Sequence, residues 1–189
     1  MPDPLNDVLT AAVERVSAAI VAVQASNPVV VIDGRSGAGK SSLAARLARA
    51  WPLRTPAQLL ALDSVYPGWD GLAQGSRIVH ENVLIPHGRD VIGIWRRWDW
   101  EQQQEAEAHA VSPALGLIVE GCGALNSATA ALADVTVWVD GPAQTRRQRA
   151  FDRDGDGFRA HWDMWAEQEL AHMAEHEPQR LAQITIQTP

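Results

Sequence analysis

The chain has 189 residues, of which 46% are hydrophobic and 21% charged, proportions that suit one globular domain with a substantial core. Its formal net charge is −7, with acidic residues throughout, which argues against a nucleic-acid partner and against binding to an anionic membrane. Cys122 is the only cysteine, so no internal disulfide can form, and together with the absence of a signal-peptide pattern this predicts a cytoplasmic protein.

Hydrophobic patterning predicts buried strands that alternate with helices. An N-terminal helix is expected within residues 1–27. The elements expected after it are strand 29–32, helix 41–50, strand 59–63, short pieces over 64–98 and a polar helix at 101–110. Those expected in the second half are strands 115–121 and 135–140, helices at 142–151 and 161–176, and an edge strand at 184–187. This order predicts an α/β fold with a mainly parallel central sheet and helices on both faces, in one domain over 1–189.

The first predicted strand runs into a glycine-rich segment, GRSGAGKSS. The segment matches the phosphate-binding pattern G-x-x-x-x-G-K-[ST], with a strand before it and a helix after it as that pattern requires. Glycines let backbone N–H groups approach an anion, Lys40 adds a positive charge for the β- and γ-phosphates, and the Ser41 hydroxyl is placed to hold Mg²⁺. The residues expected to bind ATP are Gly34, Arg35, Ser36, Gly37, Ala38, Gly39, Lys40, Ser41 and Ser42.

Lys40 is the only lysine among 16 basic residues. A glycine-rich turn that merely joins a strand to a helix would not explain why the one lysine stands in the pattern. The scarcity of lysine also excludes a GTP-binding switch, because the N-K-x-D motif of those proteins needs a second lysine. Larger ATPase classes usually need a longer chain and signature sequences that are absent.

Two further predicted strands end in acids, Asp63 in LLALD and Glu120 in LIVEG. Ligands of open α/β sheets gather at the carboxyl ends of the strands, so both carboxylates are expected beside the glycine loop. A carboxylate there can hold Mg²⁺ or accept a proton from a hydroxyl that attacks the γ-phosphate. Each acid alone could instead be a helix cap or a turn residue. The predicted metal ligands are Ser41, Asp63 and Glu120.

From about Val29 to Ile186 the chain resembles the uridine kinase and phosphoribulokinase group of P-loop small-molecule kinases. The matching stretches are IDGRSGAGKSS, LDSVYPGW, IPHGRDVIGIWRRWDW, LIVEGCG and RRQRAFDRD. The resemblance implies a three-layer P-loop kinase fold in which Asp63 is the base for the acceptor hydroxyl and Glu120 helps to hold Mg²⁺. It also implies that Trp98-Asp99-Trp100 lines the acceptor pocket within an acceptor-binding segment, 64–113. Where uridine kinases carry a Thr/His-rich stretch, this chain has EQQQEAE, which leaves the acceptor open.

The predicted helix from residue 142 places Arg146, Arg149 and Arg153 on one face. Because it runs into a break rich in glycine and aspartate, residues 146–160 are expected to form a short helical or loop lid. Arg149 and Arg153 would there stabilise charge on the transferring phosphoryl group, although a solvated helix face is the alternative. The run DRDGDGFRAHWD also matches the opening of a calcium-binding EF-hand loop, but its twelfth position is Asp163 instead of Glu.

Four tryptophans in the irregular segment could stack on a planar or sugar-like acceptor, or could roof the core of that segment. Polar side chains near them could bind hydroxyls or an anionic group. The residues predicted to bind the acceptor are Asp63, Tyr66, Asp70, Arg96, Trp98 and Asp99. His172 and His176, on the predicted 161–176 helix, are expected at the surface.

These features predict an ATP-dependent phosphotransferase that uses Mg²⁺ and moves the γ-phosphoryl group to a hydroxyl of a small nucleoside- or sugar-like metabolite. The predicted catalytic residues are Lys40, Asp63, Arg149 and Arg153, in a monomer or homodimer. Two alternatives stay open. One is a nucleoside monophosphate-type kinase, which needs further cations such as Arg77, Arg96 and Arg97. The other is an ATP-binding regulatory module without transfer activity.

Overall fold

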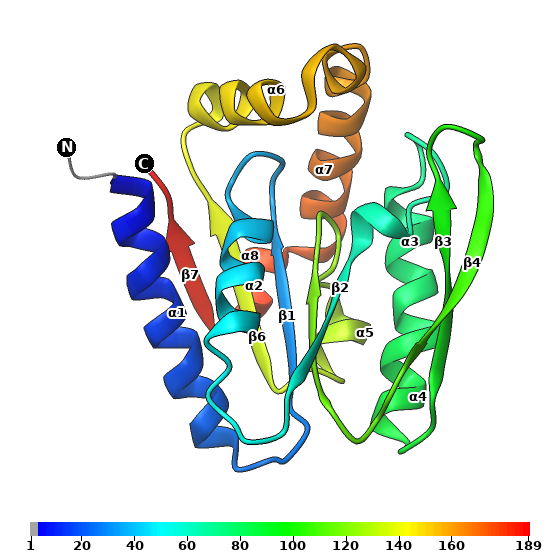
Figure 1. Cartoon of the computed structure of the whole chain (residues 1–189). Helices are drawn as coiled ribbons and strands as arrows, with labels where there is room; N and C mark the ends of the chain where they lie inside the picture. Colours follow the sequence, from blue (N-terminus) through cyan, green and yellow to red (C-terminus); the bar gives the residue numbers. More distant parts are fainter. Residues whose placement is uncertain (1–3) are drawn as a thin grey trace.

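Five parallel strands form the central sheet, in the spatial order β2-β5-β1-β6-β7 (Figure 1). Their bounds are Ala57–Ala61 (β2), Gly116–Glu120 (β5), Val29–Gly34 (β1), Val135–Asp140 (β6) and Ile184–Gln187 (β7). The computed structural model describes residues 4–189. β1 and β5 are buried along their whole length, as parallel strands covered on both faces must be. The predicted parallel sheet, with its edge strand at 184–187, is confirmed.

Helices cover both faces of the sheet. Their bounds are Pro4–Val23 (α1), Lys40–Arg49 (α2), Leu72–Val79 (α3), Ile85–Gly88 (α4), Ser127–Ala130 (α5), Ala143–Arg159 (α6), Trp162–His176 (α7) and Pro178–Leu181 (α8). A 3₁₀ turn, Leu62–Ser64, follows β2, and a π-helical turn, His80–Leu84, joins α3 to α4. Within residues 4–189, no helix has the length and apolar character that crossing a membrane requires.

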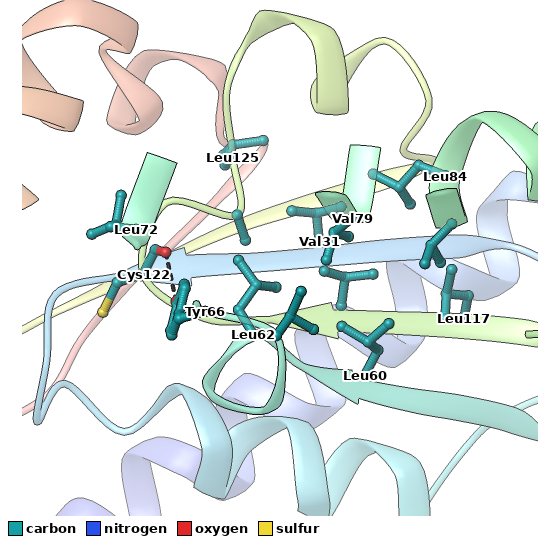
Figure 2. Close-up of a cluster of buried hydrophobic side chains, with 14 of the residues drawn as sticks. Val31, Leu60, Leu62, Tyr66, Leu72, Val79, Leu84, Leu117, Cys122 and Leu125 are labelled. Carbon is teal, nitrogen blue, oxygen red and sulfur yellow. Dashed lines mark hydrogen bonds between the residues drawn. The ribbon is translucent and has the colours of Figure 1, made fainter. Parts of the chain in front are cut away.

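Alternate residues of β1 enter two separate hydrophobic cores. Val30 and Ile32 pack with α1 and α2 on one face, whereas Val29 and Val31 pack with α3 and its neighbours on the other. Figure 2 shows the second core, in which Val31 lies among Leu60, Leu62 and Leu117. The period of two therefore produces the three-layer arrangement that the sequence predicted.

All five strands point the same way, so their carboxyl ends meet at one edge of the sheet. The glycine loop follows β1 at this edge, the 3₁₀ turn follows β2, and Glu120 ends β5. Helix α6 lies across the same edge, over the glycine loop (Figure 1). Parallel pairing thus gathers residues that are far apart in the sequence into one crevice.

The predicted polar helix at 101–110 is wrong. Residues Gln104–Val111 form a strand, β4, which pairs with Gly93–Asp99, β3, in an antiparallel hairpin. Side chains of the partner strand stabilise β4. The Arg97 guanidinium donates two hydrogen bonds to the Glu107 carboxylate, and the His109 ring stacks on Trp95 with ring centroids 4.7 Å apart. The helix propensity of Gln, Glu and Ala is a weak preference that such pairing overrides.

Helix α6 is longer than predicted, and its break is narrower. It continues to Arg159, and the expected glycine- and aspartate-rich break over 154–157 is confined to Gly155, whose φ of 66° and ψ of −149° are not helical. Asp152, Asp154 and Asp156 lie on helical turns and do not form the calcium-binding loop. Across residues 4–189 no group of three or more His, Cys, Asp or Glu side chains is arranged to hold a metal ion.

Candidate active site

The glycine loop is supported by buried side chains behind it. Arg146 is 2% exposed, donates from Nη1 to the Ser36 carbonyl at 3.1 Å, and pairs through Nε with Asp140 at 3.1 Å. Its own backbone packs so closely that a Cβ on Gly37 would lie 1.9 Å from the Arg146 carbonyl oxygen. Arg146 therefore does not face the phosphates, as the predicted arginine face would require, but holds the loop from behind.

The second support comes from α7. Glu169 is 4% exposed, and its Oε1 accepts the Ser36 N–H at 2.7 Å, while its Oε2 pairs with Arg35 Nε at 3.3 Å. Asp33 accepts the Gly34 N–H at 2.6 Å and contacts His172 Nε2 at 3.1 Å. Sequence reasoning missed Glu169 and Asp33. It also placed His172 at the surface, which is wrong, because His172 is buried against Asp33.

The Lys40 ammonium is the cation at the centre of the site. Its Nζ donates to the Arg35 carbonyl at 3.0 Å and lies 3.3 Å from Cys122 Sγ. Burial disfavours the charge on Lys40, but the acidic groups around it, with Cys122, Glu120 and Glu169 foremost, outweigh this effect and raise its pKa. Burial also raises the pKa of the Cys122 thiol to about 12, so at neutral pH the thiol is neutral and a poor nucleophile.

A small cavity of about 50 Å³ opens between the loop and the ends of the neighbouring strands; we call it the phosphate cavity. Its lining residues are Ser36, Gly37, Gly39, Lys40, Ser41, Ser42, Asp63, Glu120, Cys122 and Arg153. The structure therefore brings the two predicted strand-end acids together with Lys40 and one lid arginine. Asp63 lies on the 3₁₀ turn, beyond the last residue of β2, so the strand ends earlier than predicted.

The donor set of the phosphate cavity suits Mg²⁺. Ser41, Asp63 and Glu120 offer a hydroxyl and two carboxylates, the oxygen ligands that this ion prefers. Burial raises the pKa of Glu120; the Lys40 charge opposes that shift and the Asp63 charge adds to it. A divalent cation here would relieve the cost of holding these carboxylates ionised.

A second cavity, of about 330 Å³, adjoins the first; we call it the acceptor cavity. Its lining residues are Ser36, Asp63, Tyr66, Trp69, Trp100, Arg153, Asp154, Gly157, Phe158 and Trp165. Ser36, Asp63 and Arg153 line both cavities. Arg153 is held in place by Asp154, which accepts two hydrogen bonds from its guanidinium at 2.8 and 2.7 Å.

Aromatic side chains make up half of the residues that line the acceptor cavity. Trp69 stacks on His161 with ring centroids 4.3 Å apart and contacts Phe158 at 5.6 Å. Trp100 lies 4.8 Å from Trp69 and donates its indole N–H to the Asp63 carbonyl at 2.9 Å. Trp69 and Trp100 also pack against the neighbouring hydrophobic core, which confirms the interpretation of these rings as the roof of that core.

Of the predicted acceptor residues, only Asp63 and Tyr66 line the acceptor cavity. The hydroxyl of Tyr66 is already engaged, since it donates to the Cys122 carbonyl at 2.7 Å (Figure 2). Asp70 is exposed outside the cavity, and Asp99 accepts the Glu101 and Gln102 amides in the hairpin turn. Arg96 and Trp98 line a different hollow between the hairpin and α3.

Arg149 also differs from its prediction. Its guanidinium donates to Thr188 Oγ1 at 3.2 Å and to the Pro189 carbonyl at 2.7 Å. It lines neither the phosphate cavity nor the acceptor cavity, because Thr188 and Pro189 at the end of the chain hold its guanidinium. Arg153 is the predicted lid arginine that the structure places at the crevice.

Comparison with solved structures identifies the fold. The chain superposes on a structure described as a possible uridine kinase from Bacillus stearothermophilus with a TM-score of 0.68 and 16% identity, covering 92% of this chain and 96% of that one. It also superposes on the YGR205w protein with a TM-score of 0.60 and 9% identity, covering 95% and 93%. No protein-family model matches the sequence, and no curated protein matches it in sequence. The chain therefore has a uridine kinase-like P-loop fold, as the sequence predicted.

Gly37→Ala is expected to destabilise the protein. Gly37 has a φ of 75°, and an added Cβ would meet the Arg146 backbone, so strain and steric overlap should cost about 2–5 kcal/mol of unfolding free energy. Urea unfolding followed by circular dichroism measures this. Gly157→Ala is the control, because nothing lies within 4 Å of its added Cβ, and it should be neutral or slightly stabilising. A stable Gly37→Ala protein would contradict the packing described.

Glu120→Gln is expected to raise the melting temperature of the ligand-free protein at neutral pH. The pKa of Glu120 is raised in the folded state, so the folded state binds more protons, and ionisation of Glu120 costs stability as the pH rises. Removing the charge removes that cost. The difference in Tm from the wild type should shrink as the pH falls toward 4.5, the ordinary value for this group. A lower Tm for Glu120→Gln at neutral pH would argue against this charge balance.

Glu169→Ala is expected to cost about 1–3 kcal/mol of stability, because it leaves the buried Ser36 N–H without its acceptor. Glu169→Gln keeps an acceptor oxygen and should lose less. Thermal unfolding of both variants beside Glu167→Ala, an exposed glutamate on the same helix, tests the contact. Equal stability of Glu169→Ala and Glu167→Ala would show that the contact contributes nothing.

Proposed function

We propose that the protein is an ATP-dependent phosphotransferase that moves the γ-phosphoryl group of Mg-ATP to a hydroxyl of a small nucleoside- or sugar-like metabolite. The observation that carries this proposal is the junction of the two cavities. Asp63 and Arg153 line both the phosphate cavity and the acceptor cavity. A hydroxyl bound beside Asp63 would thus face a phosphoryl group held at the glycine loop, which is the arrangement that transfer needs.

Each residue at the junction has a role in this reaction. Lys40 and the loop amides would hold the β- and γ-phosphates, while Ser41, Asp63 and Glu120 would supply the oxygen ligands for Mg²⁺. When bound, the ion would neutralise charge on the phosphate oxygens. Asp63 orients the acceptor hydroxyl and accepts its proton as the new O–P bond forms and the bond between the γ-phosphorus and its bridging oxygen breaks, which releases ADP. Arg153 stabilises the negative charge that develops on the transferring group.

The walls of the acceptor cavity favour a hydroxyl acceptor over a phosphate acceptor. Trp69, Trp100 and Phe158 offer aromatic surface for a ring or an apolar sugar face. Arg77, Arg96 and Arg97, the cations that a nucleoside monophosphate would need, are not among the lining residues of the acceptor cavity. Among the described residues, 4–189, Arg153 is the basic residue that lines it, and Asp154 already pairs with Arg153.

Asp63→Asn should retain ATP binding within about threefold and lose acceptor-dependent turnover by about 10²–10⁴-fold, since the amide cannot accept the hydroxyl proton. Calorimetry with Mg-ATP and ADP release with an acceptor measure the two effects separately. Asp70→Asn, which changes an exposed carboxylate outside the cavity, is the matched control and should have wild-type turnover. Unchanged turnover in Asp63→Asn would remove Asp63 from the reaction.

A panel of nucleosides, sugars and nucleoside monophosphates, scored by ADP release, tests the acceptor class. The proposal expects turnover with a hydroxyl acceptor and none that depends on an acceptor phosphate. Turnover only with monophosphates would support the alternative kinase type. ATP binding without turnover across the panel would support the regulatory module.

A further inference from the structure

A third cavity, of about 380 Å³, lies apart from the active site, between α3, the π-helical turn, α5 and α7. None of its lining residues lines the phosphate cavity or the acceptor cavity. It is larger than the acceptor cavity, and the proposed transfer reaction makes no use of it. Such a concave site with convergent polar groups is a candidate for ligand binding in its own right.

Basic side chains from three elements converge on this cavity. They are Arg77 from α3, His80 from the π-helical turn, and His172 and His176 from α7. Within the part of the chain that the structure describes, Glu175 is the one acidic residue of this lining, and its carboxylate lies 3.8 Å from His176 Nε2. The excess of N–H donors over carboxylates in this lining therefore favours a ligand that offers hydrogen-bond acceptors, such as an anionic group.

Two of these basic groups are free to bind a ligand. Neither the Arg77 guanidinium nor the His80 imidazole makes a hydrogen bond or ion pair with any residue of the described range 4–189. They stand three residues apart, so they project from neighbouring turns toward the same side. Arg97 and Arg153 are held by carboxylates, whereas Arg77 is an exposed cation at the rim of this cavity.

The rest of the lining suits a short carbon skeleton. Leu72, Ala73, Ala128 and Ala171 contribute apolar surface, while further hydrogen-bonding groups come from Ser76, Asn126, Ser127 and Gln168. A bare divalent cation does not fit this set, because Arg77 would repel it and only one carboxylate is available. A bare inorganic anion would leave the apolar floor unused.

We propose that this cavity is a binding site for a small organic anion, a carboxylate or phosphate ester on a short carbon skeleton, with Arg77 and His80 as its principal ligands. The guanidinium fork makes charge-assisted bonds to the anionic group, and the imidazole adds a further donor. The floor of the site includes His172, whose Nε2 contacts Asp33, the acceptor of the Gly34 N–H. A ligand here is thus separated from the start of the glycine loop by two side chains.

Calorimetry of the full chain with citrate and with glycerol 3-phosphate, in magnesium-free buffer, tests the site. The titrations compare the wild-type chain with variants at Arg77 and His80, which do not line the phosphate cavity, so that binding at the glycine loop is distinguished from binding here and failure of the proposed kinase activity does not affect the result. We expect one of the two probes to bind, and Arg77→Gln combined with His80→Gln to weaken that binding at least tenfold. Which probe binds distinguishes a carboxylate ligand from a phosphate ester.

Arg89→Gln serves as the matched control, because Arg89, the residue that follows α4, is exposed and does not line the cavity. It should leave probe binding unchanged. Thermal unfolding of each variant checks that it is folded, and His80 can be tested alone if the double variant is unstable. The proposal is overturned if neither probe binds at millimolar concentration, or if Arg89→Gln weakens binding as much as Arg77→Gln does.

Discussion

The hydrogen bonds that fix the backbone of the glycine loop are the interaction on which the rest of this structure depends. Ser36 donates its N–H to Glu169 and receives the Arg146 guanidinium at its carbonyl, while the Ala38 carbonyl accepts the hydroxyl of Thr188. These contacts come from α7, from α6 and from the residue that follows β7. Since they do not involve a phosphate, the loop is preorganised, and a bound triphosphate would not have to supply the free energy of ordering it.

Charge balance explains why the site tolerates so many acids. Asp33, Glu120 and Glu169 are all buried near Lys40, and the unpaired burial of three carboxylates would be costly. The Asp33 carboxylate accepts hydrogen bonds from three backbone N–H groups. Glu169 forms an ion pair with Arg35 and accepts the Ser36 N–H. Glu120 has the fewest compensating partners, which is why burial dominates its pKa and why it is the carboxylate most suited to a metal ion.

Most of the fold could be predicted because it depends on local patterns. Val29–Ile32 is a continuous β-branched run, and the glycine loop has its own sequence signature, so both are visible without any tertiary information. Gln104–Val111 could not be assigned correctly, because its strand is stabilised by Arg97 and Trp95 across the hairpin and its own residues prefer a helix. The sequence feature that indicates a strand here is the alternation of Glu105, Glu107 and His109 with alanines, a period of two residues.

The site was predictable to the extent that strand ends determine it. Asp63 and Glu120 could be placed because parallel strands end at one edge. Glu169 could not, since nothing in an ordinary amphipathic helix indicates that one glutamate turns inward to a loop 133 residues earlier in the chain. Arg149 and Arg153 look equivalent in the sequence. Only the course of the chain after β7 shows that the Arg149 guanidinium donates hydrogen bonds to Thr188 and Pro189.

Gly155 divides α6 into two parts that belong to different halves of the site. Arg153 precedes it, on the part of the helix that Arg146 anchors to the glycine loop, whereas Phe158 follows it and forms a wall of the acceptor cavity. Rotation about Gly155 would move Phe158 without displacing the Arg153 guanidinium. Under the proposed reaction, substitutions downstream of Gly155 would change the shape of the acceptor cavity and leave the position of Arg153 unaltered.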